Sequence, residues 1–222
     1  MTPQIAVSIL SGTTGSNGND FLDSLLASVK NSNVTAIVPA ASGKKKKVTT
    51  VAGISKIPTT QRFARYGQGC SCCTVRSDLI VKIKEIVAED RADHVLVQIP
   101  PNGDLDIVGK TFTVANKDGY RLADVAMLER LIVVIDGPRL IENLRSAAGQ
   151  SLFDRISVAT VIGIENASAL APETFQNISE TLNSFNPGAL LIRDDDTAAL
   201  QTVNFGRATP RIQPMQPSAC SL

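Results

Sequence analysis

Six short runs of apolar residues, separated by segments with helical periodicity, constrain the fold of this chain more than any other feature. Residues 5–10 are apolar except for Ser8, as expected of a strand that is buried on both faces of a parallel sheet. Strands that alternate with helices form a three-layer α/β sandwich around a mostly parallel sheet, and we predict that fold class here. The other five predicted strands are residues 33–38, 94–99, 131–135, 158–164 and 189–192.

The predicted domain organisation is one domain followed by a short tail. With 222 residues, of which 43% are hydrophobic and 19% charged, the chain can bury one complete α/β core. We predict a domain over residues 1–208. The segment 209–222 contains three prolines and little periodicity, and we predict a flexible tail there.

Charge and hydropathy exclude several classes of partner. The formal net charge is +1 and the chain has no tryptophan, so no global basic field favours nucleic acid or an anionic membrane. The lysine run 44–47 predicts either a solvated loop or a docking site for an acidic partner. Residues 1–10 lack the pattern of a signal peptide, and no run of 18 apolar residues exists. We therefore expect a cytoplasmic protein, or one in another reducing compartment, that does not insert into a membrane.

Three of the four cysteines, Cys70, Cys72 and Cys73, lie within four positions. The periodic segment that follows predicts a helix over residues 75–89, with Thr74 as its N-cap. Cysteines beside a helix N-terminus lie in a positive field that favours the thiolate, which is the form that binds metal. The spacing therefore predicts a site for Zn²⁺ or a similar divalent metal, with an unidentified fourth ligand. The alternative is three half-buried cysteines without a ligand.

The turn after the first strand has the setting of a phosphate-binding loop but lacks its key residues. A strand, a turn rich in glycine and serine, and a helix follow one another, as in such loops. The motif would require glycine at 17, lysine at 18 and serine or threonine at 19, whereas the chain has Asn17, Gly18 and Asn19. We interpret the turn as a vestigial nucleotide loop that stays empty. Its candidate residues are Gly12, Gly15, Ser16 and Gly18.

The side chains after this turn suggest what replaces a phosphate. Asp20 and Asn19 lie at the predicted start of the first helix, where a side chain that caps the free amides would hold the loop in order without a ligand. A carboxylate there would also repel a polyphosphate.

Other candidate residues lie at the carboxyl ends of the predicted strands, where open parallel sheets place their sites. This rule brings together Asp136, the pair 165–166 and the segments 12–20, 39–43 and 100–103. The single histidine, His94, is the first residue of its strand, and we predict a surface or edge position for it and no metal ligation.

Several of these segments, taken together, resemble a known family, the GTPase domain of CobW-type proteins. The resemblance covers roughly residues 4–193 in collinear order, and it is most specific in the block Gly-Cys-Ser-Cys-Cys-Thr-Val-Arg. CobW-type proteins are related to UreG and HypB and act as metallochaperones or metal-insertion GTPases, typically with zinc or cobalt, so the resemblance implies a P-loop NTPase-like fold. The matching segments are 10–16, 69–79, 133–136, 182–183 and 186–189.

The departures from that family imply a protein that does not hydrolyse GTP. The switch segment aligns with residues 39–42, the third-strand glutamate with Gln98, and the guanine-reading motif with residues 165–168. Each change removes a charge or a donor, so we expect no GTP binding and no enzymatic turnover. Two interpretations stay open. The chain is a carrier or adaptor that binds metal through its cysteines, or it is a scaffold that binds another protein in a homo- or hetero-oligomer.

Overall fold

The structure is a computed structural model, and it describes most of residues 4–205. The segments outside the described part are 1–3, 14, 17, 31, 39–48, 52–53, 59–70, 90–91, 100, 102–104, 116–118, 147–148, 204 and 206–222. The predicted domain boundary near residue 208, the predicted tail and the lysine run 44–47 therefore lie outside it.

One sheet with eight described strands organises the chain, in the order β3-β4-β2-β5-β1-β6-β7-β8. All neighbouring strands are parallel except β3 and β4. This confirms the mostly parallel sheet, to which β4 and the edge strand β3 add two strands beyond the six predicted. The bounds are β1 Ile5–Gly12, β2 Val34–Val38, β3 Thr49–Val51, β4 Ile54–Pro58, β5 His94–Ile99, β6 Ala126–Asp136, β7 Val161–Glu165 and β8 Leu190–Arg193.

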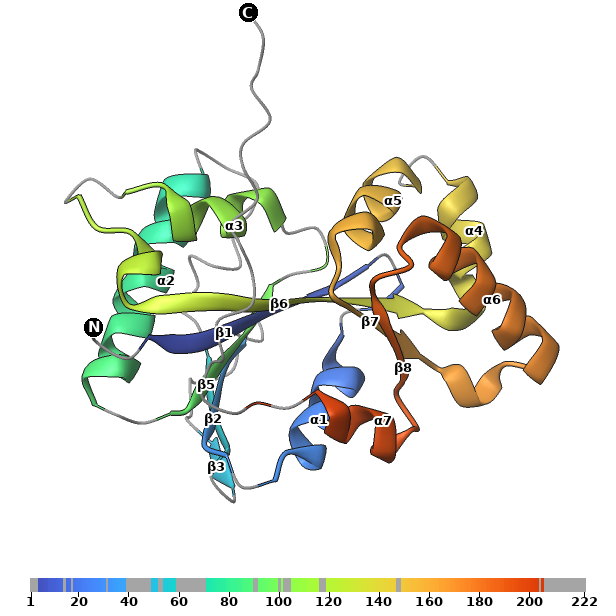
Figure 1. Ribbon diagram of the computed structural model, residues 1–222, viewed down its shortest axis with the longest axis horizontal. Helices are drawn as coiled ribbons and strands as arrows, with labels where there is room; N and C mark the ends of the chain where they lie inside the picture. The colour runs from blue at the N-terminus through green and yellow to red at the C-terminus, as the bar shows by residue number, and fades with distance from the viewer. Residues whose placement is uncertain are drawn as a thin grey trace, which may run out of the picture.

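Helices cover both faces of the sheet, which confirms the three-layer sandwich. Figure 1 shows α1 and α7 on one face and the larger set from α2 to α6 on the other. The bounds are α1 Asn19–Ser28, α2 Ser71–Ala88, α3 Leu105–Thr113, α4 Leu140–Arg145, α5 Gly149–Val158, α6 Pro172–Phe185 and α7 Thr197–Thr202, with short 3-10 turns at Leu122–Asp124, Gly137–Arg139 and Ala167–Ala169.

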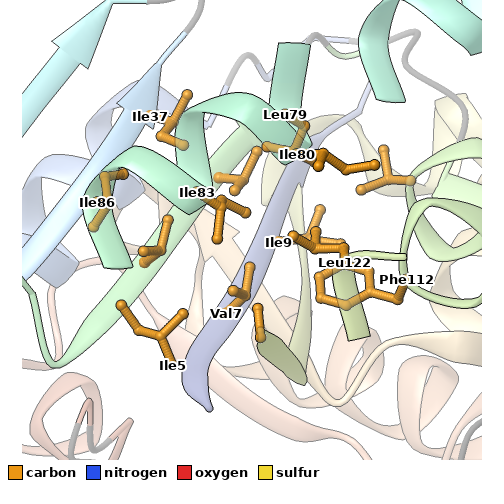
Figure 2. Packing of buried hydrophobic residues seen from close by; sticks show 14 of the residues in the cluster. Ile5, Val7, Ile9, Ile37, Leu79, Ile80, Ile83, Ile86, Phe112 and Leu122 are labelled. Atoms are coloured by element: carbon orange, nitrogen blue, oxygen red, sulfur yellow. The ribbon is translucent and has the colours of Figure 1, made fainter. Parts of the chain in front are cut away.

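The alternation of side chains along β1 explains why both faces are covered. Val7 and Ile9 point into a core beneath α2, whereas Leu10 belongs to the core beneath α1. Figure 2 shows Leu79 and Ile83 of α2 over the first of these faces. A third core lies beneath α4, α5 and α6. A strand that is covered twice in this way is expected to be almost entirely apolar, as residues 5–10 are except for Ser8.

The helix α2 begins earlier than predicted. It starts at Ser71 and not after Thr74, so Thr74 is not its N-cap. As a result, the backbone of Cys72 and Cys73 belongs to the first helical turn and does not precede it.

The predicted strand 158–164 is wrong in its first three residues, because α5 extends to Val158 and β7 begins at Val161. A distant side chain closes the end of this helix. The amide nitrogen of Asn186 donates to the carbonyl oxygens of Ile156 and Ala159, each at 2.8 Å. These bonds add to the satisfaction of carbonyl groups at the end of the helix and just beyond it.

Three further elements escaped prediction. The helices α3, α5 and α7 were not expected, and β6 is longer than the predicted 131–135 because its first residues pair with β1 despite the charged Glu129 and Arg130.

Candidate functional site: the loop at the end of β1

Two glycines with positive φ shape the turn between β1 and α1. The φ angles of Gly15 and Gly18 are 93° and 72°. A Cβ atom on Gly18 would lie 2.8 Å from Cδ2 of Leu10, so a side chain would require Leu10 to shift as well as a strained backbone conformation. Ser16 is buried between them, and its Oγ accepts a hydrogen bond from the amide of Gly18 at 3.1 Å. Gly12, Gly15, Ser16 and Gly18 therefore lie together in one turn.

The carboxylate of Glu165 reaches this turn from the end of β7. Its Oε2 accepts a hydrogen bond from Ser16 Oγ at 2.5 Å, and its Oε1 accepts one from the amide of Phe21 at 3.0 Å. Phe21 is the third residue of α1, so this amide is one of the donors that the helix cannot satisfy itself. Glu165 is buried, and both of its oxygens have donors. An internal anion thus binds at the start of the helix.

The predicted capping by Asn19 and Asp20 is wrong. The residue at the N-cap position is Gly18, and no side chain caps the helix from there. Asp20 is exposed. The Oδ1 of Asn19 instead accepts a hydrogen bond from Nε2 of Gln98 at 2.7 Å, which joins the loop to the end of β5. The left-handed conformation of Gly18 and the approach of Glu165 together account for the difference.

A second carboxylate lies on the other side of the loop, at the end of β6. Asp136 is buried, and its Oδ1 accepts a hydrogen bond from Nδ2 of Asn166 at 3.3 Å. The guanidinium of the exposed Arg139 approaches its other oxygen at 3.7 Å. A Cβ atom on Gly15 would lie 3.4 Å from this second oxygen, so the carboxylate borders the loop directly. The loop is therefore bordered by two carboxylates, which is an unfavourable setting for a polyphosphate.

Arg155 of α5 links the carboxyl ends of β1 and β5. The sequence did not predict this role. Nη1 of Arg155 donates to Ser11 Oγ at 2.8 Å, to the carbonyl oxygen of Gly12 at 3.2 Å and to that of Pro101 at 2.7 Å. No local pattern marks this residue, because its partners are far away in the sequence. The segments predicted to meet at the carboxyl ends of the strands thus do so wherever the structure describes them.

The cysteine cluster is only partly within the described chain. The backbone of Cys72 and Cys73 lies in the first turn of α2, their side chains are outside the described part, and so is Cys70. Among the described residues, no group of three or more histidine, cysteine, aspartate or glutamate side chains is arranged to hold a metal ion. The predicted metal site therefore stays a prediction.

Comparison with known proteins decides the family. The family model of the CobW/HypB/UreG nucleotide-binding domain matches residues 6–193, which is most of the chain. The chain belongs to this family. The zinc-regulated GTPase metalloprotein activator 1 of Dictyostelium discoideum is 24% identical over 223 residues, a match that covers 87% of this chain and 46% of the relative. The chain thus spans about half the length of that relative.

Solved structures of CobW/HypB/UreG proteins share the fold. The Zn(II)-bound YjiA GTPase of E. coli superimposes with a TM-score of 0.58 at 15% identity, over 85% of this chain and 57% of that one. Nickel-bound HypB of Helicobacter pylori gives 0.51 at 13% identity, over 90% and 83% of the two chains. These similarities confirm the expected P-loop NTPase-like architecture. No helix in the described part of this CobW-family chain is long and apolar enough to cross a membrane.

Proposed function

We propose that this CobW-family chain carries a divalent metal such as Zn²⁺ on Cys70, Cys72 and Cys73 without binding or hydrolysing GTP. The position of Glu165 is the observation that supports the absence of GTP binding. Its carboxylate holds the donors of Ser16 and Phe21 that an incoming anion would compete for. A protein anion that is already bound and buried leaves the loop complete without a ligand.

The conformation of Gly18 supports the same conclusion. The nucleotide-binding motif has its lysine at this position, but Gly18 has a φ of 72° and its missing Cβ would contact Leu10. A lysine at this position would be strained in the observed backbone conformation and would displace Leu10. The difference from a nucleotide-binding loop therefore includes the path of the main chain as well as the identity of the side chains.

The metal half of the proposal is supported by the donor set and by the relatives. Three cysteines in four positions offer soft thiolate ligands, which suit Zn²⁺. The relative from Dictyostelium is named a zinc-regulated activator, and the YjiA and HypB structures contain zinc and nickel, respectively. We infer that the first turn of α2 presents at least Cys72 and Cys73 to a shared ion.

A scaffold that binds another protein is the second candidate. The observation that favours it is the set of side-chain links across the strand ends. Asn19 with Gln98, Arg155 with Pro101, and Ser16 with Glu165 hold the rim in one arrangement. Nucleotide-dependent switching needs a rim with two arrangements, whereas a fixed rim suits a constant binding surface or a permanent subunit of an assembly.

Zinc titration with mass-spectrometric mapping of alkylated thiols separates the two candidates. We expect about one Zn²⁺ per chain, with Cys70, Cys72 and Cys73 protected. Cys72→Ser should abolish this protection while circular dichroism stays unchanged, and Cys220→Ser is the matched control that should retain it. Free alkylation of all three thiols in the presence of zinc would overturn metal binding and leave the scaffold as the better candidate.

A nucleotide titration tests the proposed absence of GTP binding independently of the metal. A fluorescent GTP analogue should show no binding below about millimolar concentration, since only roughly 4 kcal/mol of binding free energy corresponds to that affinity. Micromolar affinity would overturn the proposal that the loop is closed, whatever the result of the zinc titration.

A further inference from the structure

A second polar cluster lies at the opposite end of the sheet, far from the loop at the end of β1. Nε2 of His94, the first residue of β5, is 2.9 Å from Oγ of Ser8 in β1. Its Nδ1 is 3.4 Å from Oε2 of Glu129 in β6. The neighbouring Arg130 has its Nη1 2.7 Å from Oε1 of Glu129. Four polar side chains from three adjacent strands therefore meet within the sheet.

The burial of this cluster contradicts the predicted surface position of His94. His94 and Ser8 are both fully buried, because β5 is a central strand with β1 and β2 on its two sides. Within the described part of the chain, three buried atoms lack a hydrogen-bond partner, namely Nδ1 of His94, Oε2 of Glu129 and Nη1 of Arg130. These atoms lie at ion-pair distances but not in hydrogen-bonding geometry, so the cluster is incompletely satisfied.

The order serine, histidine, glutamate resembles a nucleophile relay, but the surroundings do not allow catalysis in this state. Ser8 lies in the middle of β1 and is paired on both sides, with Leu96 of β5 and Arg130 of β6. A substrate would have to enter the core to reach its hydroxyl. The functional question is therefore what covers the cluster and whether that cover moves.

The cover includes Val203 and Phe205, the two described residues that follow α7. The ring of Phe205 packs edge-on against the imidazole of His94, with 4.7 Å between the ring centres and 69° between the planes. The preceding helix α7 has only six residues and lies beside α1 on this face of the sheet (Figure 1). A shallow pocket of about 160 Å³ borders these residues and is lined by Ser28, Val29, Lys30, Gln201, Val203 and Phe205. The cover is thus short. Its side chains Val203 and Phe205 are buried in the core beneath α1, and a pocket open to solvent borders them.

We propose that α7 and Phe205 form a latch over the Ser8–His94–Glu129 cluster, and that the latch opens when His94 takes up a proton. Among the described residues, the charged groups beside the imidazole are Glu129 and Arg130, both from β6. Arg130 repels a protonated imidazole, and Glu129 attracts it but is itself paired with Arg130. Ser8 from β1 and Phe205 from the latch are uncharged. A buried imidazolium under an apolar ring is therefore unfavourable, whereas hydration through the opened latch removes the conflict.

The titration of His94 sets the expected size of the effect. Burial and the nearby Arg130 lower the pKa of His94 from 6.5 to about 3 in the closed state. If opening restores the ordinary pKa, the open population should rise roughly 25-fold between pH 7 and pH 5. Burial also raises the pKa of Glu129, which favours the closed state as the pH falls, so 25-fold is an upper value.

Hydrogen exchange of the full chain, corrected for the pH dependence of the intrinsic rate, measures this opening. Peptides from Thr197–Thr202 should lose protection by up to roughly 25-fold between pH 7 and pH 5. Peptides from Pro172–Phe185, on the other face of the sheet, should keep theirs where their amides exchange through local openings, because such openings leave His94 covered. Equal loss in both regions would mean that only global unfolding uncovers His94 and would overturn the latch, as would no loss in the first region.

Two variants identify the titrating group. His94→Gln keeps a polar group near Ser8 but cannot titrate, so the pH dependence at Thr197–Thr202 should disappear. Phe205→Ala should increase exchange already at pH 7 and reduce the ratio between pH 5 and pH 7, because His94 is then partly hydrated in the closed state. An unchanged 25-fold ratio in either variant would assign the effect to another group and overturn the proposal.

Proton NMR supplies a check on the wild-type chain that does not depend on any variant. His94 is the only histidine, so its imidazole resonances are unambiguous. We expect the closed state to show no titration between pH 7 and pH 5, with exchange to a protonated, open form as the pH falls. A single resonance that titrates near pH 6.5 while Thr197–Thr202 stays protected would overturn the coupling.

Discussion

Two glutamates at opposite ends of the sheet, the buried Glu165 and the half-buried Glu129, are satisfied to different degrees. Glu165, at the loop after β1, has a hydrogen-bond donor for each carboxylate oxygen. Glu129, beside His94, pairs one oxygen with Arg130 and has no hydrogen-bond donor for the other within the described chain. The carboxylate of Glu165 is fully hydrogen-bonded without a ligand. The carboxylate of Glu129 is not, and water that enters through the opened latch would supply the missing hydrogen bond. A closed loop and an openable latch follow from the same principle of polar satisfaction.

The sharpest way to break this comparison is the same substitution at both glutamates. Glu165→Gln should lower the free energy of unfolding by about 3 kcal/mol, because it weakens two hydrogen bonds to a charged group and turns an amide NH₂ towards one of the donors. Glu129→Gln should cost about 1 kcal/mol or less, since its carboxylate is already poorly satisfied. Urea unfolding of the two variants measures the difference. Equal losses would show that the two environments are not distinct.

The pH dependence of the free energy of unfolding tests the His94–Glu129 side of this comparison. The pKa of His94 is about 3 in the folded chain against 6.5 when it is unfolded. The unfolded state therefore binds more protons between these values, and the stability is fully present above pH 6.5 and falls as the pH drops towards 3. From pH 7 to pH 5 the loss attributable to His94 should be about 2 kcal/mol. Urea unfolding at pH 7 and at pH 5 measures this loss, and the part that depends on His94 should be absent in His94→Gln.

The same comparison shows what the sequence could predict. Local features were accessible, since the apolar run at residues 5–10 predicted a strand covered on both faces, and β1 is covered in this way. Long-range contacts were not accessible. Ser16 and Glu165 are 149 positions apart, and Ser8 and His94 are 86 apart, so no local pattern reports either pair. Ser8, the one polar residue in its run, was the only signal of a buried polar partner.

The cysteine cluster, unlike these long-range contacts, could be predicted from a local pattern. Its spacing is a local and specific signal, so Cys70, Cys72 and Cys73 could be selected from the sequence alone. The start of the following helix was misjudged by three to four residues, because Ser71 and Cys72 have no strong helical preference and the helix is fixed by its later apolar face at Ile80 and Ile83.

The conformation of the loop can be tested at two glycines. Gly18 and Gly119 both have positive φ, at 72° and 82°, but only at Gly18 would a Cβ meet a neighbour closely, at 2.8 Å. Gly119→Ala measures the conformational strain alone, about 1 kcal/mol, and Gly18→Ala should add a steric contribution for a total of about 2 kcal/mol. Thermal and urea unfolding give both values. If Gly18→Ala costs no more than Gly119→Ala, the loop has room for a side chain and the argument against a lysine at residue 18 is lost.

The smallest expected effect on the free energy of unfolding is that of Asp20, which was predicted from the sequence, with Asn19, to cap α1. A true N-cap would lose about 1 kcal/mol on replacement by alanine. Asp20 is exposed in the first turn of α1 and is not at the N-cap position, so Asp20→Ala should remove no more than a weak interaction with the helix dipole, about 0.3 kcal/mol. Its loss should also shrink in high salt, because the interaction is exposed to solvent, whereas the loss for Glu165→Gln should not. A salt-independent loss of 1 kcal/mol at Asp20 would return the capping role to this residue and would weaken the assignment of Glu165 as the anion that closes the loop.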